Sequence, residues 1–551
     1  MKSFHTLAGV MLASAFTITD AVAQQPQLAG PWAHDANALW QTLHVSPNGD
    51  DANQGWTSAD PFRTIGAAVA AVDDLVAQGL ISVAQTPSIY GNGGVTINLA
   101  PGIYTVTTPI ELPAFGVCIE AGRGGAGSQV VVRGSLPVPV FSISENYGPF
   151  DALGAAGQGL LPASEIRNLT IECPSNAIGV SIDMRSAAPA PEADIAVGVI
   201  GCDFAAMGLY PVLDLPIGIQ IYSGSGQRSM RNRIVSNDFE GLLYAVDIHG
   251  GSAAHSDLIR SNQIQGCAMG VAAEAGTGWA SATRPRVLSN MIAGCGSQNF
   301  QPVGGLPFGA GVFLGECSGQ LIGNTIAYTQ NSCPSPNNCG TPVGFTWDGA
   351  AGIVVFGPSG PMNGRSSLVI ANNLLFNPAY VRGNAVVESE EIVLEQAQRI
   401  DQLIEANDFD GTSNLVAPND VQVGSGNVAI GDPSFQSGAP GAYDLHLSAA
   451  SLGIVNEGDR VFVIPGAAAS FQIGQSSFDS SCALDADLDS RTARAAGALE
   501  ASVRRGADQP ADTQLRAPAS ASVDANGNVN PAVGQLGLEL DAPVGSTAFV
   551  F

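Results

Sequence analysis

A short motif recurs along the middle of the chain and limits the folds that the chain can adopt. In each copy an asparagine is followed two residues later by isoleucine, leucine or phenylalanine, and the spacing between copies varies from 25 to 48 residues. A repeat that keeps a short core while its loops vary in length is typical of a solenoid. Asparagine tolerates left-handed backbone geometry and hydrogen-bonds to neighbouring backbone, so we expect these residues to stack in a ladder at one corner of the coil. The motif residues are Asn237, Asn262, Asn290, Asn324, Asn372 and Asn407.

A second pattern, seven residues long, recurs with the same repeat. Its second and fourth positions are apolar in every copy, and this alternation predicts strands that point those side chains inward. With two such strands per repeat and no helix between them, the sequence predicts an all-β fold, a single-stranded right-handed parallel β-helix. The irregular insertions do not suit the evenly spaced blades of a propeller. The copies begin at residues 179, 218, 245, 270, 311 and 352.

The two ends of the repeat region support the same fold. Residues 43–79 contain a strand, a turn and an amphipathic helix that would cover the open end of the solenoid. Its apolar face is formed by Ile65, Ala68, Val69, Val72 and Val76. This segment resembles the opening of proteins of the pectate-lyase-like superfamily, and residues 431–500 resemble the closing segment of choice-of-anchor-Q proteins. The resemblance implies a right-handed parallel β-helix but no single chemistry, because such coils include lyases, hydrolases, epimerases and adhesins.

The N-terminus predicts export. Lys2, a short apolar run and the small residues of 21–23 together are typical of a signal peptide spanning 1–23. We expect a linker over 24–42, the β-helix with its cap and closing segment over 43–500, and a tail over 501–551 to which no role is assigned. The protein would then be secreted or periplasmic.

The net charge limits which classes of molecule the protein can bind. The net charge is −27 and Lys2 is the only lysine, which argues against nucleic acid and anionic membranes as partners and excludes a catalytic lysine.

Two pairs of cysteines lie where a disulfide could form. Cys333 and Cys339 bracket a loop that they could close. Cys267 and Cys295 occupy the same place in adjacent coils, where either a disulfide or an inward ladder of thiols would fit.

The third and fifth positions of the seven-residue pattern point outward and carry the candidate site. Stacking the coils brings these positions together in one polar and aromatic stripe, of a kind that suits an extended polysaccharide chain. The predicted catalytic residues are Asp183, Tyr222, Asp247, His249 and Glu274; the predicted substrate-binding residues are Arg185, Gln220, Arg228, Phe313 and Phe356.

Three chemistries are compatible with this stripe. In a β-elimination lyase, Tyr222 or His249 would remove a proton beside a uronate carboxylate, which Gln220, Arg185 or a cation would neutralise. In a glycosidase, two of the three acids would work as a pair. In a calcium site, Asp247 with Glu274 or Asp183 would bind the ion through their carboxylate oxygens. The sequence thus predicts a polysaccharide lyase or glycoside hydrolase; the alternative is a non-catalytic surface, adhesion or structural coil, because outward strand positions are polar without any function.

Overall fold

The fold is described from a computed structural model. It covers residues 41–77, 95–114, 116–121, 129–144, 163–185, 197–208, 214–223, 230–251, 256–275, 283–296, 309–330, 350–358, 366–378, 380–382, 385–387, 389–395, 400–405, 407–410, 415–416, 427–430, 432–439 and 442–447, together with short strands between 457 and 540. The predicted signal peptide, Arg228 and the loop from Cys333 to Cys339 lie outside these residues. No helix in the part described is long and apolar enough to cross a membrane.

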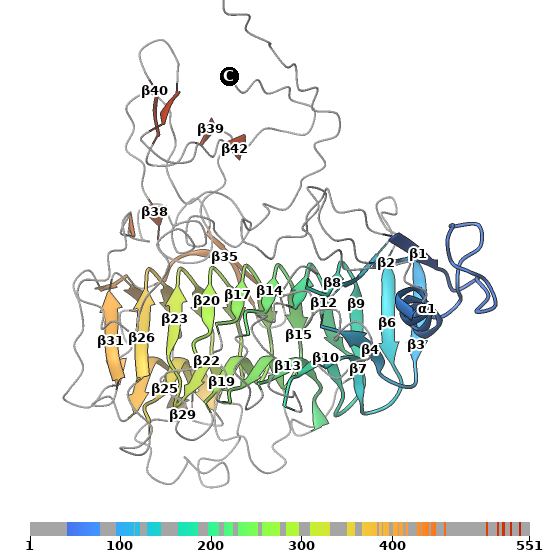
Figure 1. Ribbon diagram of the computed structural model, residues 1–551. Coiled ribbons are helices and arrows are strands. Elements are labelled where there is room, and N and C mark those ends of the chain that lie inside the picture. The colour runs from blue at the N-terminus through green and yellow to red at the C-terminus, as the bar shows by residue number, and fades with distance from the viewer. Residues whose placement is uncertain are drawn as a thin grey trace, which may run out of the picture.

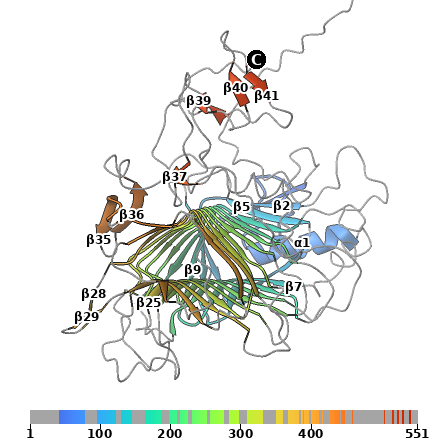
Figure 2. The same ribbon diagram turned by 90° about the vertical axis from the view of Figure 1, so that its left-hand side faces the viewer.

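The chain forms a right-handed parallel β-helix whose coils stack along one axis (Figure 1). Three long parallel sheets run the length of the solenoid, and Figure 2 shows them nearly end-on. The predicted fold class is therefore confirmed, but each coil holds three strands rather than two. The asparagine motif spans a corner, because a left-handed residue before the asparagine bends the chain and divides what the sequence suggests is one strand.

We call the three sheets A, B and C. Sheet A runs in the order β1 (Gln41–Val45), β2 (Val95–Leu99), β5 (Val117–Ala121), β8 (Glu165–Arg167), β11 (Gly198–Ile200), β14 (Arg233–Val235), β17 (Leu258–Arg260), β20 (Arg286–Leu288), β23 (Gly319–Ile322), β26 (Ser366–Ala371) and β31 (Ile400–Glu405). Sheet B runs β3 (Gly102–Val106), β6 (Val130–Gly134), β9 (Thr170–Cys173), β12 (Asp203–Ala206), β15 (Asp238–Glu240), β18 (Gln263–Gln265), β21 (Met291–Ala293), β24 (Thr325–Ala327), β27 (Leu374–Phe376), β32 (Asp408–Phe409) and β34 (Val428–Ala429). Sheet C runs β4 (Ile110–Pro113), β7 (Pro139–Ser144), β10 (Ile178–Asp183), β13 (Ile217–Tyr222), β16 (Tyr244–His249), β19 (Met269–Glu274), β22 (Gly309–Gly315), β25 (Ala350–Phe356), β30 (Glu390–Glu395) and β33 (Leu415–Val416).

The core fills the inside of the coil as the alternation predicts. The second and fourth positions of the seven-residue pattern all face it and are fully buried, and they stack on their own kind from one coil to the next. These side chains are Val180, Ile182, Ile219, Ile221, Val246, Ile248, Val271, Ala273, Val312, Leu314, Ile353 and Val355.

A helix closes the N-terminal end of the solenoid, as predicted. Helix α1 (Ile65–Ala77) begins after Thr64, whose Oγ1 accepts a hydrogen bond from the backbone N–H of Ala67 at 3.2 Å and so caps it. Its apolar face buries Val69 and Val72 against the first strands of sheets A and C. Figure 1 shows α1 at the blue end of the stack, where it shields the core from solvent.

The predicted asparagine ladder exists, with one member wrongly placed. Each ladder asparagine receives hydrogen bonds on its Oδ1 from the backbone N–H and Nδ2 of the previous one. In the "NN" pair it is Asn373 that does this, while Asn372 has a φ of 54° and occupies the left-handed position before it. Serine or glycine fills that position in other coils, and the ladder extends beyond the predicted members to Asn427.

Short antiparallel strand pairs lie between the last coils and after them. The hairpin of β35 (Phe435–Ala439) and β36 (Ala442–Leu447) packs Tyr443 and Leu445 on the outer face of sheet B. Another pairs β28 (Tyr380–Arg382) with β29 (Ala385–Val387). The remaining pairs are β37 (Glu457–Gly458) with β38 (Val503–Arg504), β39 (Leu515–Arg516) with β42 (Glu539–Leu540), and β40 (Ala521–Val523) with β41 (Val529–Pro531).

The cysteines of the described residues are free thiols. Cys267 and Cys295 are both fully buried and unbonded to each other, so the structure favours the inward ladder over the disulfide. Burial raises the pKa of Cys267 to about 12, and such a thiol stays protonated and unreactive at neutral pH.

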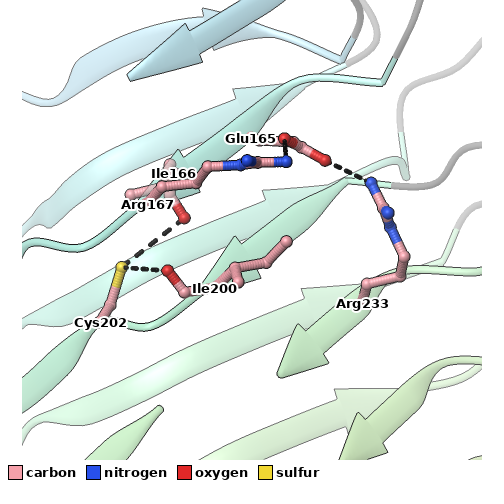
Figure 3. Close-up of polar contacts among 6 residues, drawn as sticks. All are labelled: Glu165, Ile166, Arg167, Ile200, Cys202 and Arg233. Carbon is pink, nitrogen blue, oxygen red and sulfur yellow. Dashed lines mark hydrogen bonds and ion pairs between the residues drawn. The ribbon is translucent and has the colours of Figure 1, made fainter. Parts of the chain in front are cut away.

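A buried carboxylate links three coils on the outer face of sheet A. Glu165 forms ion pairs with Arg167 on its own strand and with Arg233 two coils further on (Figure 3). Gly198 lies between them in register with both, and its lack of a side chain leaves room for Glu165 to reach across.

This arrangement gives a prediction for Gly198→Ala. A Cβ there would lie 3.0 Å from Cγ and 3.3 Å from Oε1 of Glu165, so we expect the free energy of unfolding to fall by about 1–2 kcal/mol. Chemical denaturation measures the change. Gly66→Ala is the matched control, because a Cβ there meets nothing within 4 Å and alanine favours a helix. An unchanged or increased stability in Gly198→Ala, as expected for the control, would contradict the bridging role of Glu165.

Candidate active site

The strand pairing of sheet C brings the fifth positions into one column. Asp183 pairs with Tyr222, Tyr222 with His249, and His249 with Glu274 in successive coils. Beyond a glycine, the column continues through Phe356 to Glu395. The predicted register is therefore confirmed. The side chains of Asp183 and His249 are 33% and 35% exposed, so this column is open to a ligand.

The third positions form a second, covered column. Gln220 pairs with Asp247, and these residues are only 8% and 5% exposed although they point away from the core. Phe313, further along the column, is 8% exposed and belongs to an apolar cluster on the outer face of sheet C. Its burial leaves little ring surface for a sugar, whereas Phe356 is half-buried and packs edge-on against it with ring centroids 5.4 Å apart.

Asp247 joins the two columns by hydrogen bonds. Its Oδ2 lies 2.8 Å from Nε2 of His249, on the same strand, and it accepts a hydrogen bond of 3.0 Å from Nε2 of Gln220 in the preceding coil. A buried carboxylate that orients an imidazole is the arrangement by which proteins fix which ring nitrogen carries the proton. His249 is thereby positioned as a group that can exchange a proton through its other nitrogen.

A stack of flat groups runs along the open column. The rings of Tyr222 and His249 are stacked with centroids 4.6 Å apart and planes 12° apart. The guanidinium carbon of Arg185 lies 4.0 Å from the centre of the Tyr222 ring. Arg185 also donates hydrogen bonds from Nε and Nη2 to the carboxylate of Asp183, at 3.0 Å and 2.6 Å. The stack thus links side chains of three successive coils.

The charges of the site act on its titrating groups. The hydrogen bond to Asp247 raises the pKa of His249 above its usual 6.5, and the negative charges of Asp247 and Glu274 raise it further. Burial raises the pKa of Tyr222, with the charge of Asp247 adding to the effect. The hydrogen bonds from Arg185 lower the pKa of Asp183. Near neutral pH the phenol is therefore protonated, while His249 holds its proton more tightly than a free histidine.

Two of the three acids are already engaged. Asp183 is bound by Arg185, and Asp247 by His249 and Gln220, whereas the carboxylate of the exposed Glu274 makes no hydrogen bond or ion pair with the described residues. Within those same residues, no three histidine, cysteine or acidic side chains are arranged to hold a metal ion.

One neighbouring residue was missed by the sequence pattern. Tyr244 begins strand β16 and lies half-buried, close enough that Asp247 and Glu274 add to the effect of its own burial, which raises its pKa to about 12. It precedes the seven-residue unit, so the pattern gave no signal for it. A tyrosine that starts a strand whose outward positions are polar is the only cue that the sequence offers.

Comparisons with known proteins give only distant likenesses. No protein-family profile and no curated protein matches the chain. Among solved structures, a pectate lyase, Pel9A, is 14% identical with a TM-score of 0.40, over 77% of this chain and 92% of that one. A rhamnogalacturonan lyase is 10% identical with a TM-score of 0.34, over 72% of this chain and 91% of that one. The Dettilon tailspike protein is 12% identical with a TM-score of 0.34, over 70% and 67%.

The fold rests on the chain's own strand pairing. The three long parallel sheets make the chain a parallel β-helix. At these identities and TM-scores, the function has to be argued from the residues of this chain.

Proposed function

We propose that this protein binds a polysaccharide along the open column of sheet C and cleaves it by β-elimination, with His249 as the base. The observation that carries the proposal is the hydrogen bond of 2.8 Å between His249 Nε2 and Asp247 Oδ2, next to the stacked Tyr222. Glycosidases need two working carboxylates. Here Asp183 and Asp247 are engaged, which favours a mechanism based on the histidine.

Residues of this chain can supply both proton transfers of the proposed elimination. The unprotonated Nδ1 of His249 takes a proton from the sugar carbon beside a carboxyl group, and the electron pair of that C–H bond forms a carbon–carbon double bond. The bond to the glycosidic oxygen breaks, and that oxygen takes a proton from the Tyr222 phenol, which its raised pKa keeps protonated. Arg185, whose side chain is 58% exposed, would face the carboxyl group of the sugar.

The proposal also places the protein outside the cytoplasm. The predicted signal peptide would deliver it to the periplasm or beyond, where polysaccharides of this kind are accessible. Detection of the mature chain in the periplasmic or culture fraction, starting after residue 23, tests this part.

A panel of uronate-containing, esterified and neutral polysaccharides tests the activity. We expect absorbance from the new double bond to appear together with new reducing ends, without added calcium. Reducing ends without that absorbance would indicate hydrolysis and overturn the elimination. Binding with neither signal would favour the non-catalytic alternative, a coil that only displays a polysaccharide-binding wall.

The raised pKa of His249 predicts how this activity depends on pH. The base must be unprotonated, so we expect kcat/KM to rise as pH increases through a midpoint above 6.5. In Asp247→Asn, which removes the charge and hydrogen bond that raise this pKa, the residual activity should rise at a lower pH. Rate measurements across the pH range check both points. An acidic midpoint in the unmodified protein would contradict the role of His249 as base.

A further inference from the structure

Gln220 does not lie where a residue that contacts substrate would lie. It is 8% exposed, and its Nε2 donates to Asp247 Oδ2 at 3.0 Å. We propose that Gln220 is a positioning residue that, through Asp247, fixes which ring nitrogen of His249 carries the proton. The inference rests on the proposed function for its catalytic meaning, although the geometry itself does not depend on it.

The hydrogen-bonding capacity of the three side chains decides which of them donates and which accepts. The amide nitrogen of Gln220 can only donate, so the Asp247 oxygen that receives it must accept, as an ionised carboxylate does. The same oxygen lies 2.8 Å from Nε2 of His249, and this nitrogen must then be the donor. In the neutral imidazole the proton therefore sits on Nε2, and Nδ1 carries the lone pair that a base needs.

Among the described residues, Gln220 and His249 are the side chains that hydrogen-bond to the Asp247 carboxylate. In the third-position column, Asp247 is flanked by Gln220 in one coil and by Ala272 in the next, and alanine has no donor. Ser181 stands one coil beyond Gln220, in register with it rather than with Asp247. Without Gln220 the carboxylate would be held by His249 alone and would be free to turn about its Cβ–Cγ bond.

The other groups facing His249 do not set its tautomer. Tyr222 stacks flat on the ring from one side, and Glu274 lies in register on the other side and acts on it through its charge. Arg185 lies beyond Tyr222, with its guanidinium over the Tyr222 ring. Tyr244 starts the same strand. The charge of Glu274 raises the pKa of His249 and that of Arg185 lowers it, but among the described residues only Asp247 hydrogen-bonds to the imidazole.

Nitrogen NMR of the full chain, labelled with 15N-histidine, tests the inference without any substrate. The His249 signals are identified among the six histidines by their loss in His249→Asn. We expect neutral His249 to carry its proton on Nε2. In Gln220→Met, which keeps the volume but removes the donor, we expect a mixture of both tautomers and a lower titration midpoint, because the freed carboxylate no longer holds the hydrogen bond that raises the pKa of His249. Ser181→Ala, in the same covered column, is the control and should change neither.

Kinetics separate positioning from substrate contact. Gln220→Met should lower kcat about tenfold, the value of one well-placed hydrogen bond, and leave KM unchanged. A raised KM with an unchanged kcat would mean that Gln220 contacts the substrate and would overturn the inference. An unchanged His249 tautomer and midpoint in this variant would overturn it as well.

Gln220→Glu covers the case in which the methionine variant does not fold. The new carboxyl group is the same size and can donate to Asp247 only while the pair shares one proton. We therefore expect Nε2 protonation of neutral His249 to persist while the proton is shared and to be lost at higher pH. Behaviour like the unmodified protein at all pH values would refute the inference. If no polysaccharide is cleaved but these NMR changes occur, the proposed function fails and the positioning role stands.

Discussion

Replacing His249 by alanine is expected to lower kcat on the cleaved polysaccharide about 10³-fold, within the range that a positioned general base supplies. The substitution removes the imidazole that Asp247 orients at 2.8 Å and also the ring that stacks on Tyr222. Binding should weaken less than turnover, because Arg185 and Tyr222 keep their mutual contact. Initial rates from absorbance of the unsaturated product, together with binding measured separately, give the two quantities.

Two further variants make this result specific. Asp247→Asn should lower kcat nearly as much as His249→Ala does, because an amide can present its nitrogen to the imidazole and reverse the tautomer. His44→Gln, in strand β1 at the far end of the solenoid, should leave the rate unchanged. Full activity in His249→Ala would remove the proposed mechanism. A loss confined to Glu274→Gln would move the chemistry to the acid.

The fold could be predicted because its rules are local and repeated. Alternation within seven residues decides which side chains face the core, and stacking then follows from the repeat itself. The count of strands per coil was wrong for a local reason: the residue before each ladder asparagine from Asn237 to Asn373 adopts positive φ and turns the chain, as Ser236 does at 55°. In the "NN" pair either residue satisfies the motif, and only the hydrogen bonds show that Asn373 belongs to the ladder.

The sequence could predict where the site residues lie on sheet C, but not which hydrogen bonds they form. Register alone put His249 beside Tyr222 and Glu274. That Asp247 binds His249 on its own strand, rather than a cation or a sugar, depends on rotamers that no spacing encodes. The burial of Gln220 and Phe313 was also hidden, because an outward strand position is polar or covered according to what the rest of the chain lays over it.

Asn290→Ala is expected to destabilise the fold by about 4 kcal/mol, because it breaks the ladder at its centre. Asn290 is fully buried and its Oδ1 accepts from the backbone N–H and the Nδ2 of Asn262, at 3.0 Å and 2.9 Å. Its own Nδ2 donates to the carbonyl of Ile259 and to Oδ1 of Asn324, each at 3.0 Å. Alanine would leave the backbone N–H of Asn262 without this partner in a fully buried corner of the coil, where such a group costs about 1–3 kcal/mol, and would remove one hydrogen bond each from Asn262 Nδ2 and Asn324 Oδ1.

Chemical denaturation of the full chain would measure this loss against Asn48→Ala. Asn48 is exposed in a turn near the N-terminal cap, and only its backbone N–H makes a hydrogen bond there, so alanine should change stability by less than about 0.5 kcal/mol. Equal effects of the two substitutions would mean that the ladder contributes no stability. A large effect of Asn290→Ala with unchanged His249 titration would show that the corner stabilises the coil without shaping the proposed site on sheet C.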